Sequence, residues 1–240
     1  MKSIRILFVL LVMHVFVISC FVTDVYATDS GFFTEQLNDK DIEIVLKSLK
    51  LSTLVEEPER QAIKCFDVDK NGNIAIGFGD TIEKTVCIYD NDAVFQYGYT
   101  FKTTGDFGVE FCGGNLNLYL VRSDIFISIN LLGEVERIVK ITNSQHNNSY
   151  WNNCVFAARK TVGEVDYLVR NEMGALNFFA SSYSQLVIVS SNGEERVLYD
   201  VNSEQMIETV VTLLFVSVLV LFAICLIARE FRKRKHNTKL

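Results

Sequence analysis

Short runs of alternating apolar and polar residues fill the chain after residue 60 and constrain its fold more than any other feature. Gly, Asn and Asp separate these runs, and side chains that alternate with a period of two point to opposite faces of a sheet. The pattern predicts an all-β, antiparallel domain over residues 61–205. The expected strands are residues 62–68, 74–79, 84–89, 94–101, 107–111, 116–122, 125–129, 135–141, 154–160, 164–170, 175–181, 185–190 and 195–201.

Twelve of these thirteen strands, all except 154–160, form three similar blocks of four. Their first turns hold Gly72, Gly114 and Gly174, spaced by 42 and then 60 residues, so an insertion of about eighteen residues precedes the third block. The second turns hold Asp92-Ala93, Leu132-Gly133 and Asn192-Gly193. Four-stranded units at a period near 42 are typical of β-propeller blades. The insertion, "NSQHNNSYWNNC", predicts a polar loop that contains a sequon at Asn147 and an exposed Tyr150-Trp151 pair.

The stretch "FDVDKNGNIAIGF", residues 66–78, has the spacing of acidic and amide side chains that begins a calcium loop. An EF-hand loop starting at Asp67 needs a bidentate Glu at its twelfth position, where this chain has Phe78, and it needs a helix after that. The residues that follow alternate as a strand. The stretch therefore predicts a hairpin whose turn residues Asn71 and Gly72 tolerate positive φ, and no metal or cofactor site.

The segment "DVDKNGNIAIG" resembles the "VDxxGNIYV" hairpin of NHL-type and related bacterial β-propeller repeats. The resemblance extends over residues 62–201, closely up to 141 and loosely from 164. It implies antiparallel four-stranded blade-like repeats in a partial or small propeller. Propellers usually close with four or more blades and this chain has three, so a helical segment plugs the gap, the sheets stay open, or two chains complete one another.

Residues 28–60 carry a different pattern, in which apolar residues recur at helical spacing between Gly31 and about Glu59. Thr34 is a candidate N-cap for this segment. We expect a helical or linking segment ahead of the β domain.

Both ends of the chain predict a membrane protein. Residues 209–228 contain no charge and are long enough to cross a ~30 Å hydrocarbon core as a helix. Five of the next seven residues are Arg or Lys, which predicts a cytoplasmic tail at 229–240 and an extracellular domain before the span, a single-pass type I protein in the cell membrane. Residues 1–27 predict a signal peptide; the alternative is a lipoprotein box ending at Cys20.

The exported region is acidic, with 15 Lys and Arg against 27 Asp and Glu over residues 28–208. This charge excludes nucleic acid as a partner, because binding a phosphate backbone needs a basic face. It favours a cationic or neutral partner on encounter.

Four cysteines lie in the predicted extracellular domain. An even number permits disulfides in an exported protein, with three pairings open, and buried thiols are the alternative. These candidate residues are Cys65, Cys87, Cys112 and Cys154.

The chain has no recognisable catalytic set. His146 is the only histidine in the extracellular region, and no nucleophile elbow accompanies it. A carboxylate pair for glycan hydrolysis stays open, because the distance between two acids cannot be read from a sequence. Phe95, Tyr97, Tyr99 and Phe101 occupy every second position along one strand and so share a face, which is either core packing or a ligand platform. Tyr150 and Trp151 are further candidates for a ligand platform.

We expect a non-enzymatic extracellular binding or sensing module, tethered by one helix, whose partner is a protein or glycan at the cell surface. Its alternatives are a surface glycan hydrolase and an accessory subunit of an envelope complex. A homo-oligomer would supply the blades that one chain lacks.

Overall fold

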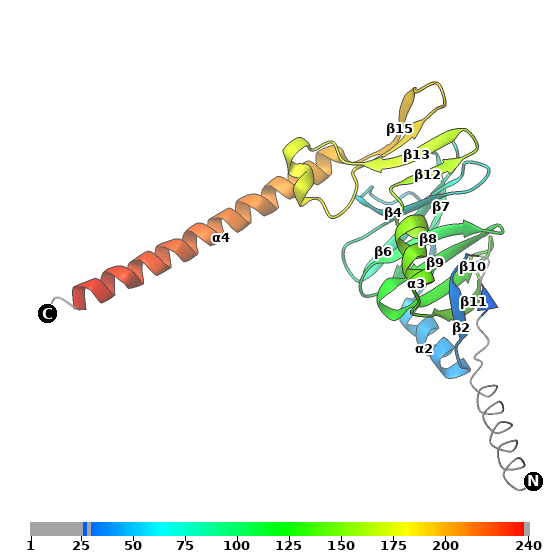
Figure 1. The fold of residues 1–240 in the computed structure, drawn as a ribbon, viewed down its shortest axis with the longest axis horizontal. Helices are drawn as coiled ribbons and strands as arrows, with labels where there is room; N and C mark the ends of the chain where they lie inside the picture. The colour runs from blue at the N-terminus through cyan, green and yellow to red at the C-terminus, as the bar shows by residue number, and fades with distance from the viewer. Residues whose placement is uncertain (1–25, 28–29, 238–240) are drawn as a thin grey trace, which may run out of the picture.

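The computed structural model describes residues 26–27 and 30–237 of the 240-residue chain. The predicted signal peptide and the lipoprotein-box alternative lie outside these residues, except for Tyr26 and Ala27. The described chain contains three antiparallel β-sheets followed by one long helix, α4 (Asn202–Asn237), which projects away from the sheets (Figure 1).

Each sheet is built on four strands that follow one another in the sequence. Sheet B has β4 (Ile63–Val68), β5 (Ile74–Phe78), β6 (Glu83–Tyr89) and β7 (Phe95–Lys102), with β3 (Ser52–Leu54) beside β7. Sheet A has β8 (Phe107–Cys112), β9 (Asn115–Leu120), β10 (Ile125–Ile129) and β11 (Val135–Ile141), extended by β2 (Phe33–Gln36) and β1 (Tyr26–Ala27). Sheet C has β12 (Arg159–Val162), β13 (Val165–Arg170), β14 (Gln185–Val189) and β15 (Glu195–Asp200).

Sheet B lies between the other two and is buried on both faces. One core joins it to sheet A through residues such as Val86 and Leu118, and a second core joins it to sheet C through residues such as Phe66 and Leu186. This explains the continuous apolar run of β5, since both faces of a central strand need apolar side chains. Across the described residues the three sheets do not close into a barrel or a propeller.

The stretch at residues 66–78 is a hairpin, as its sequence predicts. The Asp69 carboxylate accepts the backbone N–H groups of Asn71 and Asn73, both at 2.8 Å, and Gly72 takes the positive φ of 84°. The same turn recurs at Asp90, where Ala93 has φ 62°, and at Asn130, where Gly133 has φ 81°. An acceptor side chain at the first position and a left-handed residue at the fourth position fix these turns locally.

Two predicted strands are wrong. The sequence predicts a strand at residues 154–160, but a π-helix, η2 (Trp151–Val155), follows α3 (Gln145–Tyr150). The strand β12 begins only at Arg159. Residues 175–181 instead contain the 3₁₀-helix η3 (Gly174–Phe179), where the Asn177 side chain accepts the Met173 N–H at 2.9 Å. The first turn of the third block is therefore at Gly163, with φ 61°, and not at Gly174.

The segment before the β domain is only partly helical. It contains β2, then α2 (Asp39–Leu49), then β3, and the helix is capped by Asn38 because its side chain accepts the Asp41 N–H at 2.9 Å. The predicted cap, Thr34, lies in β2.

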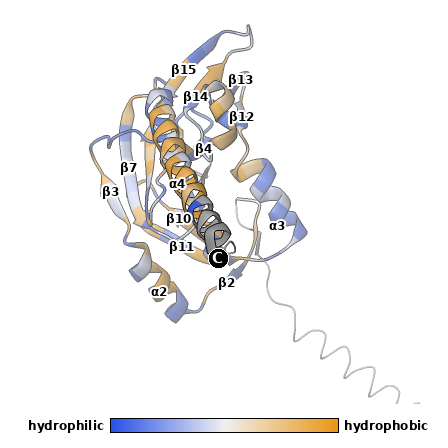
Figure 2. Cartoon of the chain, turned by 90° about the vertical axis from the view of Figure 1, so that its left-hand side faces the viewer, coloured by the Kyte–Doolittle hydropathy of each residue, from blue (hydrophilic) through white to orange (hydrophobic). Residues whose placement is uncertain are grey.

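The helix α4 contains the stretch Asn202–Ile227, which is long and apolar enough to span a membrane. In Figure 2, which colours the ribbon by hydropathy, most of this helix has the orange of hydrophobic residues. The helix starts directly after sheet C, with Asn202 donating its N–H to Asp200 at 2.8 Å, so the apolar stretch continues the last strand of the domain without a linker.

Candidate functional site

A cavity of about 580 Å³ lies where the first turns of α4 meet sheet B. Its walls come from residues within 59–62 ahead of β4, from the β5–β6 turn and the strand after it, and from residues within 201–208 at the start of α4. We call this cavity the helix-base pocket. It is formed by segments separated by more than a hundred positions in the sequence.

The helix-base pocket is strongly acidic. Its only cationic lining residue is Arg60, which pairs with Glu57 at 2.8 Å and lies 5.0 Å from the ring centroid of Tyr199. Asp80 pairs with Lys64 at 2.6 Å, and the other acids have no ion-pair partner within 4.0 Å among the described residues. All five carboxylates are exposed, so each can accept an external cation: Glu59, Asp80, Glu83, Glu204 and Glu208.

Gln205 adds an unsatisfied acceptor to the wall of this pocket. Its Nε2 donates to the Ser182 carbonyl and hydroxyl, both at 3.1 Å, while its Oε1 has no hydrogen-bond partner in the described structure. The residue is only 7% exposed. A buried acceptor left without a donor costs about 1–3 kcal/mol.

A second, shallower cavity of about 680 Å³ lies between the β6–β7 turn and sheet C. Its lining carries both signs of charge, and Arg196 already donates to the Asn91 carbonyl at 3.1 Å and approaches Asp92 at 3.7 Å. Because Asp92, Glu195 and Arg196 already have ion-pair partners within the chain, it is a weaker candidate than the helix-base pocket.

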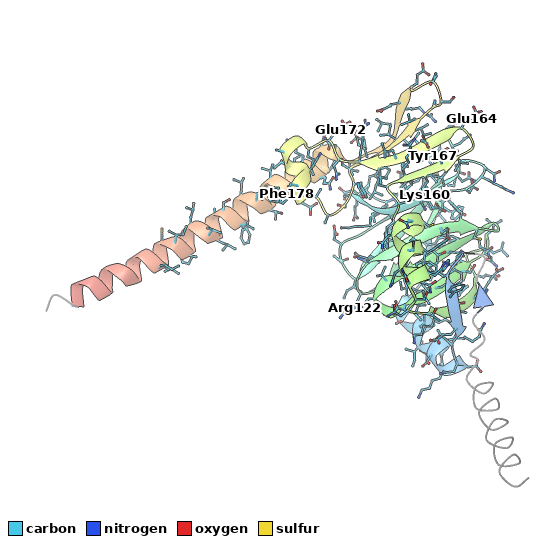
Figure 3. All side chains as sticks on the ribbon, in the orientation of Figure 1. Arg122, Lys160, Glu164, Tyr167, Glu172 and Phe178 are labelled. Atoms are coloured by element: carbon cyan, nitrogen blue, oxygen red, sulfur yellow. The ribbon has the colours of Figure 1, made fainter. Side chains whose placement is uncertain are left out.

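A different group of polar side chains lies where the three sheets meet. Lys160 of β12, labelled in Figure 3, binds the Asp67 carboxylate of β4 at 2.6 Å, and the same carboxylate accepts the Phe111 N–H of β8 at 2.6 Å. Asp67 is 6% exposed, and its partner Lys160 lies over the Phe66 ring. The Asp67 carboxylate, through its ion pair with Lys160 and its hydrogen bond from Phe111, therefore joins all three sheets.

Glu110 of β8 lies beside this ion pair. Its carboxylate accepts the hydroxyl of Tyr150 at 2.5 Å and that of Tyr119. Burial raises the pKa of the Glu110 carboxyl, while the two tyrosine hydrogen bonds act in the opposite direction. We call Asp67, Glu110, Tyr119, Tyr150 and Lys160 the junction cluster; its charged groups are partnered within the chain.

The aromatic residues predicted as a ligand platform lie in two separate places. Tyr150 and Trp151 are half-buried and pack around Phe32, which forms a core on the outer face of sheet A, so the expected exposure of this pair is wrong. Tyr97 is half-buried and Tyr99 buried in the core between sheets A and B.

The aromatic stripe of β7 is also divided between two cores. Tyr97 pairs with Ile88 and Phe95 pairs with Tyr89, so a bulge at Gln96 moves Phe95 to the opposite face of the sheet. There it packs against Tyr89 with ring centroids 6.0 Å apart. The uniform stripe expected from alternation therefore breaks at this bulge.

The four predicted disulfide cysteines lie in four different elements, β4, β6, β8 and η2. Cys65 and Cys87 lie in different cores on opposite sides of sheet B, and burial raises the pKa of each thiol to about 12. Cys154 lies in η2 and Cys112 at the end of β8, both half-buried. Cys65, Cys87 and Cys154 carry free thiols.

The polar insertion before sheet C is an ordered helical segment. The sequon residue Asn147 is 1% exposed, and its side chain binds both the N–H and the carbonyl of Phe33 at 2.9 Å. His146 contacts the Gly31 carbonyl at 2.8 Å. Both residues anchor β2 to the insertion, and Asn147 is too buried to carry a glycan.

The predicted turn residues lie at hairpin turns. Asn71 and Gly72 occupy the β4–β5 turn described above. Asn192 accepts the Glu194 N–H at 3.0 Å, and Gly193 has φ 83° in the β14–β15 turn. These residues shape the sheets and line no part of the helix-base pocket.

Sequence reasoning missed both polar assemblies. Asp67 stands out in the sequence only as the first residue of a possible calcium loop, and Glu110, Lys160 and the pocket acids belong to no local motif. The single signal that points to the pocket is the acidic composition of residues 28–208. No protein-family model matches this chain, and no curated protein matches it in sequence.

Proposed function

We propose that this chain is a single-pass membrane protein whose β-rich ectodomain binds a cationic segment of a partner in the helix-base pocket. One observation carries this proposal: five exposed carboxylates line one cavity beside a single cation, which is already paired. Carboxylates placed together repel one another, and a bound cationic group relieves that repulsion.

The pocket's position favours a partner in the same membrane. Glu204 and Glu208 lie on α4 directly before the uncharged run that starts at Thr209. A cationic segment flanking a neighbour's own span lies at the same height above the bilayer. We therefore prefer the interpretation that the binding module is an accessory subunit of a membrane complex. The topology that goes with it is a signal peptide at 1–27, an extracellular β domain and a basic cytoplasmic tail.

We further propose that the three four-stranded sheets are blade-like repeats related to NHL-type propellers. Their support is the shared order of four consecutive antiparallel strands and the recurring turn with an acceptor at its first position. A second copy of the chain is one way to complete the open arrangement.

The alternative of a surface glycan hydrolase has weaker support. Acids from two distant parts of the chain do meet in this pocket. A glycosidase holds one carboxyl group protonated near neutral pH, usually by burial, and all five pocket acids are exposed.

The test uses the full chain in nanodiscs of neutral phosphatidylcholine and a hexa-arginine peptide as the probe. We expect the double substitution Glu204→Gln and Glu208→Gln to weaken binding about three- to tenfold, since exposed ion pairs contribute about 0.2–1 kcal/mol each. The matched control is Glu134→Gln with Glu164→Gln, two acids on hairpin turns outside the pocket. If both variants lose the same fraction of their affinity for the peptide, net charge alone explains the loss, and the pocket is not the binding site.

A further inference from the structure

Among the residues whose exposure the structure describes, the most exposed aromatic side chain lies on η3, beside the start of α4. Phe178 is 89% exposed and the adjacent Phe179 is 55% exposed, and their ring centroids are 5.4 Å apart. Phe178 is labelled in Figure 3. Residues 173–181 contain no charged side chain. Two neighbouring phenylalanines in water are unfavourable, and such exposed apolar groups mark contact surfaces.

The structure holds η3 against α4. Met173, which precedes η3, contacts Thr209, with Oγ1 and Sδ 4.0 Å apart. Gln205 of α4 donates to Ser182 on the other side of η3. The Asn177 side chain stabilises the conformation of this segment, because it accepts the Met173 N–H and donates to the Asn171 carbonyl at 3.1 Å. The position of the two phenylalanines relative to α4 is therefore fixed by contacts at both ends of the segment.

Thr209 is also the first residue of the uncharged run that extends to Ala228. If α4 crosses a bilayer, the contact between Met173 and Thr209 places η3 at the level where the helix enters it. Aromatic side chains are favourable at this boundary, where apolar rings are removed from water. The charged residue nearest to this segment on its N-terminal side is Glu172, which pairs with Arg170 of sheet C at 2.7 Å.

We infer that η3 inserts Phe178 and Phe179 into the headgroup–acyl boundary of the bilayer and gives the domain a second attachment besides α4. The inference rests on the membrane attachment in the proposed function, and it does not depend on what the helix-base pocket binds. Two attachments, a span and an inserted aromatic pair, restrict rotation of the domain about the helix axis. The helix-base pocket then keeps a fixed direction relative to the membrane plane.

The test is tryptophan quenching in the full chain reconstituted into phosphatidylcholine vesicles, with and without acyl-chain bromine. Phe178→Trp and, independently, Phe179→Trp are compared with wild type, which has only Trp151. Leu132→Trp is the matched water-exposed control, because Leu132 is 82% exposed on the β10–β11 turn. Phe215→Trp, within the uncharged run, is the control for the span.

We expect the tryptophans at 178 and 179 to emit at shorter wavelength than that at 132 and to lose intensity in brominated vesicles. If bromine quenches Phe215→Trp while both η3 variants respond only to aqueous iodide, the inference is wrong and the span stands. If bromine and iodide both fail to quench the η3 variants, a protein surface covers η3, and the inference is equally wrong. If bromine does not quench Phe215→Trp, the membrane attachment itself fails.

Discussion

The junction cluster and the helix-base pocket both bring carboxylates together from distant parts of the chain, but they differ in how those carboxylates are partnered. In the junction cluster, Asp67 and Glu110 are bound by a lysine, a backbone N–H and two tyrosine hydroxyls. In the pocket, exposed acids outnumber the cations that line it. Charges that a chain pairs internally hold its parts together, whereas charges that it leaves unpaired at a concave surface are available to a partner.

The largest effect is expected from breaking the junction ion pair. Lys160→Met leaves the Asp67 carboxylate buried without its cation, and we expect the free energy of unfolding to fall by about 3–5 kcal/mol. Urea titration of the full chain in detergent micelles, followed by Trp151 fluorescence, measures the change. Arg159→Met is the matched control on the same strand, because its pair with Asp166 is exposed, and it should leave stability near that of wild type.

A second effect concerns the buried thiols, whose alkylation rate reports opening of the cores. Cys65 and Cys87, with pKa values raised by burial to about 12, should react with iodoacetamide at pH 8 far more slowly than the half-buried Cys154. Lys160→Met should accelerate both by about a hundredfold or more, in proportion to the population of open molecules. Equal rates for Cys65 and Cys154 in wild type would contradict the closed junction; mass spectrometry of tryptic peptides distinguishes the sites.

The smallest effect is a pH dependence that belongs to Glu110. Its pKa is raised in the folded state, so the folded protein binds more protons than the unfolded chain between the two pKa values. The contribution of Glu110 to stability is therefore most favourable at low pH and decreases as the pH rises through its folded pKa. We expect wild type to lose stability relative to Glu110→Gln between pH 4 and pH 8; a constant difference would contradict this assignment.

The strands were predictable because their signal is local. Alternation fixes which residues share a face, and Asp69, Asp90 and Asn130 each set a turn through their own neighbours. The failures also have local causes: "ALNFFAS" is a short, mostly apolar run with two aromatic residues and so resembles a strand, yet the Asn177 side chain accepts the Met173 N–H and closes a helical turn. The bulge at Gln96, which divides the aromatic stripe of β7, leaves no mark in the alternation.

Neither polar assembly was predictable from the sequence. Asp67, Glu110 and Lys160 lie on three different sheets, and their meeting depends on how the sheets pack. The acids at 80 and 83 come close to those at 204 and 208 only because α4 begins beside the β5–β6 turn. Composition predicted an acidic domain, and the fold determines where that charge gathers.

The most direct test of this account measures two quantities on one variant, Glu204→Gln with Glu208→Gln, in the same nanodisc preparation. We expect weaker hexa-arginine binding together with a free energy of unfolding within about 0.5 kcal/mol of wild type, as for surface substitutions in general. Unchanged binding with a clear loss of stability would contradict it, because the pocket carboxylates would then be structural, like those of the junction cluster.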